Sequence, residues 1–220
     1  MSDFEVDGNS LESNTHLFSG KEPEIYYQIN NIICHAAFTS PYRYNEGILK
    51  KAHAVAIRER FIDVIINFIR EKIDDTILRI EMANIEGESR FYVQTENAAN
   101  SIDITKYGEG VQRVFEIALM MGYCQNGILC IDEFESAIHK SLLVDFSKFV
   151  HELAERFNVQ VFLSTHSKEC IDAFVENKYK NNEITAYALS EKSDGQIECK
   201  YVDGKRLESL IDSINIDIRG

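Results

Sequence analysis

The sequence predicts an α/β domain built around a mainly parallel sheet. Two continuous apolar runs, at 127–131 and 159–165, have the composition of strands that are buried on both faces. Apolar residues recur every three or four positions in segments 109–121, 137–157 and 167–177, which is the spacing of amphipathic helices. Strands that alternate with helices in this way form parallel sheets, because each helix carries the chain back to the start of the next strand.

The composition indicates a globular cytoplasmic domain. The 220 residues are 45% hydrophobic and 27% charged. The formal net charge is −13 without a dense run of Lys or Arg, so contact with nucleic acid is expected only through a larger assembly. No run approaches the roughly 18 apolar residues of a membrane span. Five cysteines without a CxxC pair predict reduced thiols rather than disulfides or a zinc site.

The N-terminal half is less regular. Residues 1–20 are rich in Ser, Asn, Asp and Glu and predict a flexible tail, whereas 25–39 suit either a strand or a short helix. One long helix is expected at 46–72, because isoleucines recur there at helical spacing. The alternating segments 76–84 and 89–96 predict a hairpin that turns within NIEGE.

The C-terminal end predicts a second hairpin and a last helix. Residues 183–190 and 196–202 alternate around the turn Asp194-Gly195. Segment 206–214 has the pattern of a short amphipathic helix.

Two adjacent acids, Asp132 and Glu133, follow directly after the apolar run at 127–131. Open parallel sheets bind ligands at the carboxyl ends of their strands. Asp132 is suited to hold Mg²⁺, usually through water, because hard cations prefer carboxylate oxygen. Glu133 is suited to orient and polarise an attacking water in phosphoryl transfer. The alternative is that the two acids only cap the following turn.

A histidine, His166, follows the second apolar run. If the two strands are neighbours, His166 reaches the same crevice and can donate a hydrogen bond to a phosphate oxygen. The alternative is a turn histidine bonded to backbone, which is the better interpretation of a lone His. The acidic strand one helical crossover earlier favours the functional interpretation.

A glycine-containing loop precedes the helix expected at 109–121. Gly108 and Gly110 flank Glu109 where that helix begins. Exposed backbone N–H groups and the positive end of the helix dipole suit an anion at such a place. The alternative is an ordinary helix cap with flexible glycines.

Taken together and in this order, these segments resemble a known family. YGEGVQR, GILCIDEFESAIH and VFLSTHS look like the signature, Walker B with D-loop, and switch-histidine elements of ABC-type ATPase heads. The resemblance is to prokaryotic AAA-family ATPases related to OLD, RecF and SMC heads, and it covers about 100–178. In that group the D-loop often reads E-x-x-x-H, and Glu135 and His139 fill those places. The SPYR segment and the INIDIR ending also fit this group.

The resemblance implies a P-loop NTPase-like fold and a site for ATP and Mg²⁺. Residues 21–220 would be the C-terminal part of the head, with a helical and hairpin insertion at about 45–96. The implied roles are Asp132 as the Mg²⁺ ligand, Glu133 as the catalytic carboxylate, His166 as the γ-phosphate switch, and Gly108, Glu109, Gly110 and the D-loop residue Ser136 as nucleotide contacts across a head-to-head dimer.

One expected element is missing from the sequence. A phosphate loop reads G-x-x-x-x-G-K-[ST], and neither Gly20-Lys21 nor Gly204-Lys205 satisfies this pattern. ATP affinity of the isolated chain is therefore expected to be poor, and apolar residues that would pack on a missing lobe are expected to be exposed.

Three accounts of this departure stay open. The chain is the C-terminal part of a longer ATPase, a natural half that pairs with a chain bearing the phosphate loop, or a catalytically inactive interaction module. In the first two accounts it is an ATPase that works as a dimer, and the resemblance suggests a role in phage defence or DNA transactions. A nuclease is disfavoured, because no second acidic cluster with metal-ligand spacing is evident.

Overall fold

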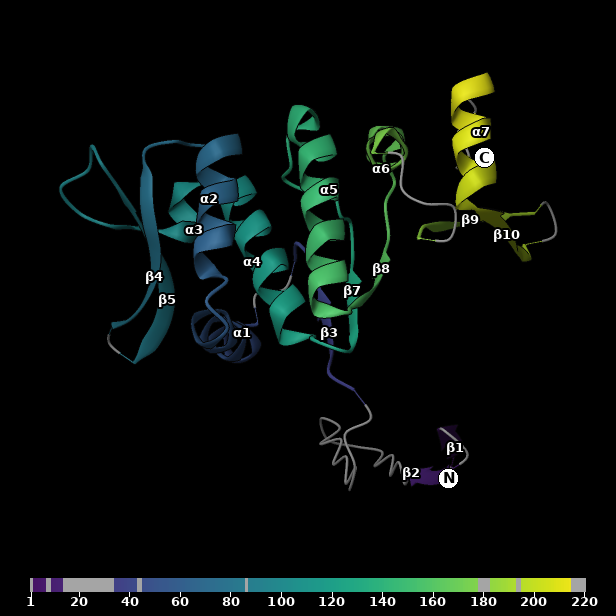
Figure 1. Ribbon diagram of the computed structural model, residues 1–220, viewed down its shortest axis with the longest axis horizontal. Coiled ribbons are helices and arrows are strands. Elements are labelled where there is room, and N and C mark those ends of the chain that lie inside the picture. Colours follow the sequence, from purple (N-terminus) through teal and green to yellow (C-terminus); the bar gives the residue numbers. More distant parts are fainter. Residues whose placement is uncertain are drawn as a thin grey trace. The chain divides into compact units, whose positions relative to one another are not determined.

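The computed structural model describes most of the chain, in two compact units that span Met1–Cys34 and His35–Gly220 (Figure 1). The described residues are 2–6, 9–13, 34–42, 45–85, 87–177, 183–192 and 195–214. Most of the segment 25–39 that was expected to form a strand or a helix therefore lies outside them, as does the INIDIR ending from residue 215 onwards.

The first unit contains a hairpin where the sequence analysis expected only a flexible tail. Strand β1 (Ser2–Val6) pairs antiparallel with β2 (Asn9–Ser13). The alternation in this segment is weak, so backbone pairing rather than side-chain pattern defines the two strands.

The core sheet of the second unit is parallel, as predicted. Its strand order is β3 (Ala36–Thr39), β7 (Ile128–Ile131) and β8 (Gln160–Leu163). β3 and β7 pair parallel, as do β7 and β8, and all three are in register from their first to their last residue. The three strands therefore end at one edge of the sheet.

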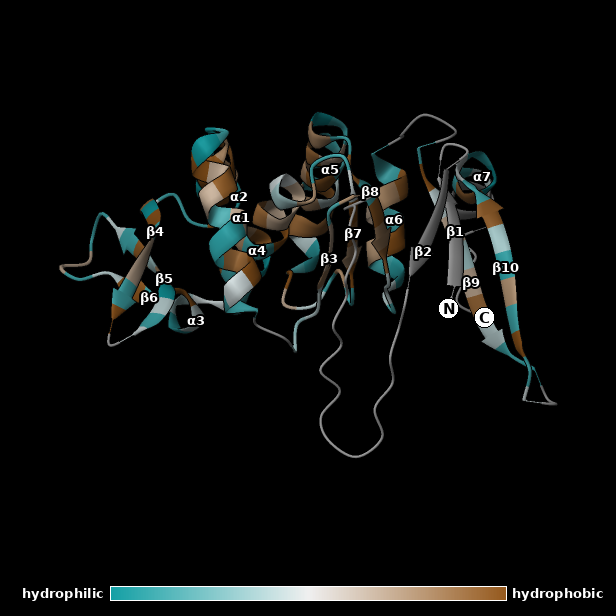
Figure 2. Cartoon of the chain, turned by 90° about the horizontal axis from the view of Figure 1, so that it is seen from below, coloured by the Kyte–Doolittle hydropathy of each residue, from teal (hydrophilic) through white to brown (hydrophobic). Residues whose placement is uncertain are grey.

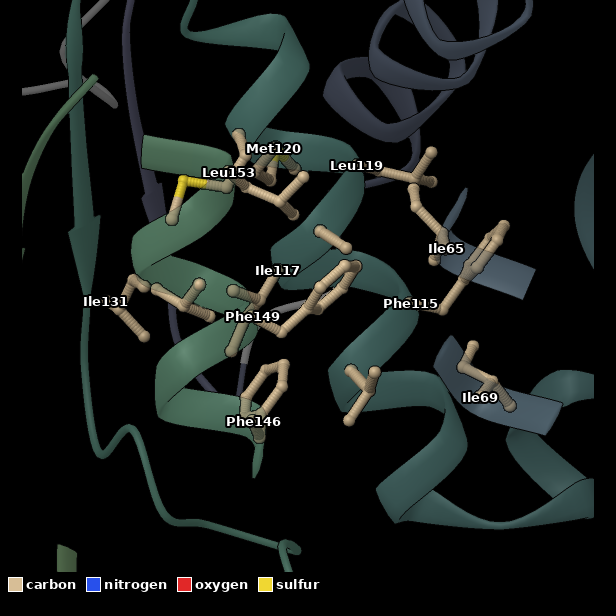
Figure 3. Close-up of a cluster of buried hydrophobic side chains, with 14 of the residues drawn as sticks. Ile65, Ile69, Phe115, Ile117, Leu119, Met120, Ile131, Phe146, Phe149 and Leu153 are labelled. Carbon is tan, nitrogen blue, oxygen red and sulfur yellow. The ribbon is translucent and has the colours of Figure 1, made fainter. Parts of the chain in front are cut away.

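Two helices cover one face of this sheet. α4 (Glu109–Tyr123) precedes β7, and α5 (Lys140–Phe157) connects β7 to β8. α4 lies at the centre of the core (Figures 2 and 3), and most of its side chains from Val111 to Gly122 are buried, the charged Arg113 and Glu116 among them. The labelled core side chains are Ile65, Ile69, Phe115, Ile117, Leu119, Met120, Ile131, Phe146, Phe149 and Leu153.

The other face of the sheet carries an exposed apolar row. Phe38, Cys130 and Phe162 are in register across the three strands, and the two phenylalanines are each 51% exposed. β8 has no further strand beside it among the described residues. The expectation that segment 159–165 is a buried strand is therefore wrong, because β8 is a half-exposed edge strand.

The expected long helix at 46–72 is in fact two helices, α1 (Glu46–Arg58) and α2 (Ile62–Lys72). The chain breaks at Arg60, whose φ is 54°. This break turns Phe61 into the core, where the ring is fully buried and lies 4.8 Å from the ring of Phe157. Helical spacing continues through the break, so periodicity alone did not reveal it.

The remaining elements include the two predicted hairpins and the predicted helices, together with a short strand and a short helix that the sequence did not predict. Asp194, which was expected in the turn of the second hairpin, lies outside the described residues. β4 (Ile77–Ile85), β5 (Glu88–Thr95) and β6 (Ile102–Asp103) form an antiparallel sheet that turns at Gly87, whose φ is 89°. The short α3 (Ile104–Tyr107) leads into α4. α6 (Lys168–Glu176) is capped by Ser167, and β9 (Thr185–Glu191), β10 (Ile197–Asp203) and α7 (Gly204–Ile214) complete the chain. None of the helices within these described elements is long and apolar enough to cross a membrane.

Candidate functional site

The carboxyl ends of β3, β7 and β8 meet, and the predicted acids and histidine follow from there. Thr39, Ile131 and Leu163 are in register. The Asp132 N–H donates to the Thr39 carbonyl at 2.8 Å, and the Ser164 N–H donates to the Ile131 carbonyl at 2.9 Å. The ladder thus extends one residue past the strands and fixes the first residue of each following loop.

Ser164 joins the two adjacent acids. Its hydroxyl donates to Asp132 Oδ1 at 2.7 Å and accepts from the Glu133 N–H at 3.0 Å. Glu133 has a φ of 46°, in the left-handed region that costs a non-glycine residue about 1–2 kcal/mol. The hydrogen bonds around it offset that cost. Sequence reasoning passed over Ser164, although its place directly after β8 and two residues before His166 was a usable signal.

Glu135 connects the acidic loop to the loop of His166. Its Oε1 accepts a hydrogen bond from the His166 N–H at 3.0 Å. Its other oxygen, Oε2, is buried and accepts no hydrogen bond from the described residues. His139, the second residue of the E-x-x-x-H pattern, caps α5, because its Nδ1 accepts from the Ser141 N–H at 3.3 Å.

A buried arginine supports the acidic loop from below. Arg113 is only 3% exposed, and its guanidinium donates to Thr39 Oγ1 at 3.0 Å and to the Asp132 carbonyl at 2.7 Å. A longer bond of 3.4 Å reaches the Glu133 carbonyl. Burial lowers the pKa of Arg113, and the charges of Glu116 and of the acidic loop oppose that effect. The guanidinium stays protonated, so one cation lies under the acids.

Arg113 lies within the YGEGVQR motif, and the sequence predicted no role for it. The signal that could have found it is a charged residue on the buried face of α4, between Val111 and Val114.

The predicted glycine loop packs beside the acidic loop of its own chain. α4 begins at Glu109, directly after Gly108. A Cβ on Gly110 would lie 2.9 Å from the Ala137 carbonyl oxygen, so only glycine fits without a shift. A Cβ on Gly108 would meet nothing within 4 Å, so packing within the chain does not explain that glycine.

Not every predicted site residue contacts the others. Ser136 donates its N–H to the Glu133 carbonyl at 3.0 Å and so belongs to the acidic turn. Among the described residues, no hydrogen bond links Gly108 or Glu109 to Asp132, Glu133 or His166. The structure thus places two groups near each other: a carboxylate and hydroxyl cluster at the strand ends, and the start of α4.

The cluster has the donor chemistry that Mg²⁺ prefers. Asp132, Glu133 and Ser164 offer only oxygen atoms, and both acids are partly exposed. A hard divalent cation takes such ligands together with water. The oxygen atoms of these three residues therefore fit a bound Mg²⁺.

This parallel sheet, with acids at the end of a central strand and helices between strands, is a P-loop NTPase-like α/β fold. The family comparison agrees, because the model of the AAA ATPase domain matches residues 9–171. The chain belongs to this AAA ATPase domain family, and its domain is of the ATPase type.

Sequence identity to individual proteins is low. An uncharacterized protein of Methanocaldococcus jannaschii is 32% identical over 114 residues, which is 51% of this chain and 99% of that protein. A structure from work on ATP-driven dimerization and DNA-stimulated activation of SMC ATPases aligns with a TM-score of 0.44 at 9% identity, over 74% of this chain and 98% of that one.

A second structure is the Smc head domain of Pyrococcus furiosus with an extended coiled coil, bound to the C-terminal domain of ScpA. It aligns with a TM-score of 0.46 at 11% identity, over 74% of this chain and 41% of that one.

Proposed function

We propose that this chain supplies catalytic residues for Mg²⁺-dependent ATP hydrolysis, as the C-terminal part of an ATPase head. The observation that carries the proposal is the joining of Asp132, Glu133 and the His166 loop at adjacent strand ends by Ser164 and Glu135. Membership of the AAA ATPase domain family supports it independently.

Each residue then has a stated role. Asp132 would hold Mg²⁺, which when bound would supply positive charge to offset that of the phosphates. Glu133 takes one proton from a water whose oxygen bonds to the γ-phosphorus while the bond to ADP breaks. His166 donates to a γ-phosphate oxygen.

The glycine loop would act on a second nucleotide. Gly108, Glu109, Gly110 and Ser136 engage ATP held by the opposite subunit of a head-to-head dimer. This part of the proposal rests on the resemblance of YGEGVQR to a signature motif.

In this proposal another segment or another chain supplies the phosphate loop, because neither Gly20-Lys21 nor Gly204-Lys205 fits the G-x-x-x-x-G-K-[ST] pattern. A phosphate loop lies between a strand and a helix. The edge of β8 beside which no described strand lies offers a place for one more strand, and the exposed row of Phe38 and Phe162 offers an apolar face for its helix. Parallel sheets are ordinarily covered on both faces. A strand–loop–helix segment would therefore complete both the sheet and the site.

The setting that the resemblance suggests is phage defence or a DNA transaction. With a net charge of −13, any contact with nucleic acid would be made by other parts of the assembly.

The test uses the native assembly isolated through a tag on this chain. Glu133→Gln is expected to lower ATP turnover by about 100-fold or more while Mg²⁺-dependent ATP binding persists. The matched control is Glu152→Gln, an exposed acid of α5, which is expected to keep wild-type turnover. Wild-type turnover in Glu133→Gln would refute the assignment.

The second candidate is an interaction module without catalysis, which the missing phosphate loop favours. It predicts that the partner stays bound equally with and without ATP. Association that depends on nucleotide would count against this candidate.

A further inference from the structure

A tyrosine that the sequence analysis did not single out lies over the acidic loop. Tyr42 follows β3 in the turn that begins at Ser40. The Tyr42 N–H donates to the Ser40 hydroxyl at 3.4 Å, and Ser40 itself is buried. Because β3 is the neighbour of β7, this turn carries residue 42 across the end of the strand that precedes Asp132.

The Tyr42 side chain contacts the predicted catalytic carboxylate. Its hydroxyl donates to Glu133 Oε2 at 3.0 Å. The pKa of Tyr42 is raised, first by this hydrogen bond and then by the charge of Glu133, with burial and Asp132 contributing less. The side chain is 79% exposed, so core packing does not account for its position.

Within the part of the chain that the structure describes, the other hydrogen bonds of Glu133 are all made by its backbone. Its N–H is bound by Ser164, and its carbonyl is near the guanidinium of Arg113. Among the described residues, Tyr42 is the one group that hydrogen-bonds the Glu133 carboxylate, and it uses a single oxygen. A carboxylate that accepts through one oxygen is restrained in its orientation and leaves Oε1 available to another donor.

We propose that Tyr42 is a positioning residue for Glu133: its hydroxyl holds Oε2 so that Oε1 faces the attacking water. The proposal rests on the proposed function. Tyr42 thereby brings the end of β3 into a site that the sequence assigned to β7 and β8 alone. Hydrolysis slows when the general base is misplaced, because proton transfer from the water requires the carboxylate within hydrogen-bonding reach and correctly oriented.

The first measurement needs no activity. Phenolate absorbance is titrated in the full chain and in Tyr42→Phe, and the difference isolates Tyr42 from the other tyrosines. We expect this tyrosine to ionise above its ordinary pH, and to ionise lower once Glu133→Gln removes the charge and alters the hydrogen bond. An unchanged titration in Glu133→Gln would overturn the proposal, because Tyr42 would then not contact Glu133.

The second measurement is turnover in the native assembly. Tyr42→Phe is expected to lower kcat by about 10-fold and leave the KM for ATP within about 2-fold, since the hydroxyl acts on the base rather than on the nucleotide. The control is Tyr201→Phe, a 55% exposed tyrosine of β10, which should keep both constants. A kcat equal to that of the control would overturn the proposal.

The double variant and the two single variants together separate the proposed role of Glu133 from that of Tyr42. Tyr42→Phe should slow Glu133→Gln no further, because both act on one step. If Glu133→Gln keeps wild-type turnover, the proposed function fails, whatever the titration shows. If Glu133→Gln is slow and Tyr42→Phe is not, only the role of Tyr42 fails.

Discussion

Replacing Arg113 with methionine tests whether a buried cation holds the acidic loop. The change removes two short hydrogen bonds, at 3.0 Å to Thr39 Oγ1 and at 2.7 Å to the Asp132 carbonyl. Each charged hydrogen bond contributes about 1.5–3 kcal/mol, and the cost of burying the cation, which disappears in the variant, offsets part of the sum. We expect the free energy of unfolding to fall by about 3 kcal/mol and, for a chain of this length, the Tm to fall by roughly 6–12 °C.

The assay is urea unfolding together with calorimetry on the full chain. Arg79→Met is the matched control, because Arg79 pairs with Glu81 at 3.0 Å on an exposed surface where its side chain is 56% accessible. Such a pair contributes about 0–1 kcal/mol. Arg113→Lys keeps the charge but loses the planar fork, so its loss should lie between the two. If the free energies of unfolding of Arg113→Met and of the control differ by less than about 0.5 kcal/mol, the guanidinium does not hold the loop.

Three further outcomes follow from the same structure. Gly110→Ala gains about 1 kcal/mol of helix propensity but places a Cβ 2.9 Å from the Ala137 carbonyl, and overpacking of about 1–3 kcal/mol makes the variant less stable in urea. Burial raises the pKa of Glu116, so stability falls as pH rises through that pKa; Glu116→Gln should be the more stable protein at pH 8 and equal to wild type below the ordinary pKa. Burial raises the pKa of Cys170 to about 12, so Cys170 should resist a thiol reagent at pH 8 while exposed Cys199 reacts; rapid labelling of Cys170 would contradict its burial.

The sequence predicted correctly those strands and helices whose spacing of apolar residues matches the burial of their side chains. Apolar runs at 127–131 and 159–165 predicted two strands of the parallel sheet, although the second is a half-exposed edge strand. The family resemblance joined Asp132, Glu133 and His166 into one site. The structure confirms that the two strands are parallel neighbours. The roles of the residues stay predictions, because no ligand contact tests them.

Other features depend on partners far away in the sequence. The helix expected at 46–72 is interrupted at Arg60, and the interruption lets Phe61 pack near Phe157, a contact that no local periodicity records. β8 is half-exposed at the edge of the described sheet, although its composition is that of a buried strand.

The site shows the same division. Asp132 and Glu133 could be assigned from sequence, since acids directly after a buried strand have a local signature. The sequence predicted no role for Ser164, Arg113 or Tyr42, because each acts through a hydrogen bond to an atom on another strand or loop. Local sequence thus determined which strand carries the acids, and only the tertiary structure decided which side chains hold them. The physical reason is that a hydrogen bond needs two atoms about 3 Å apart, and for these groups only the folded sheet provides that proximity.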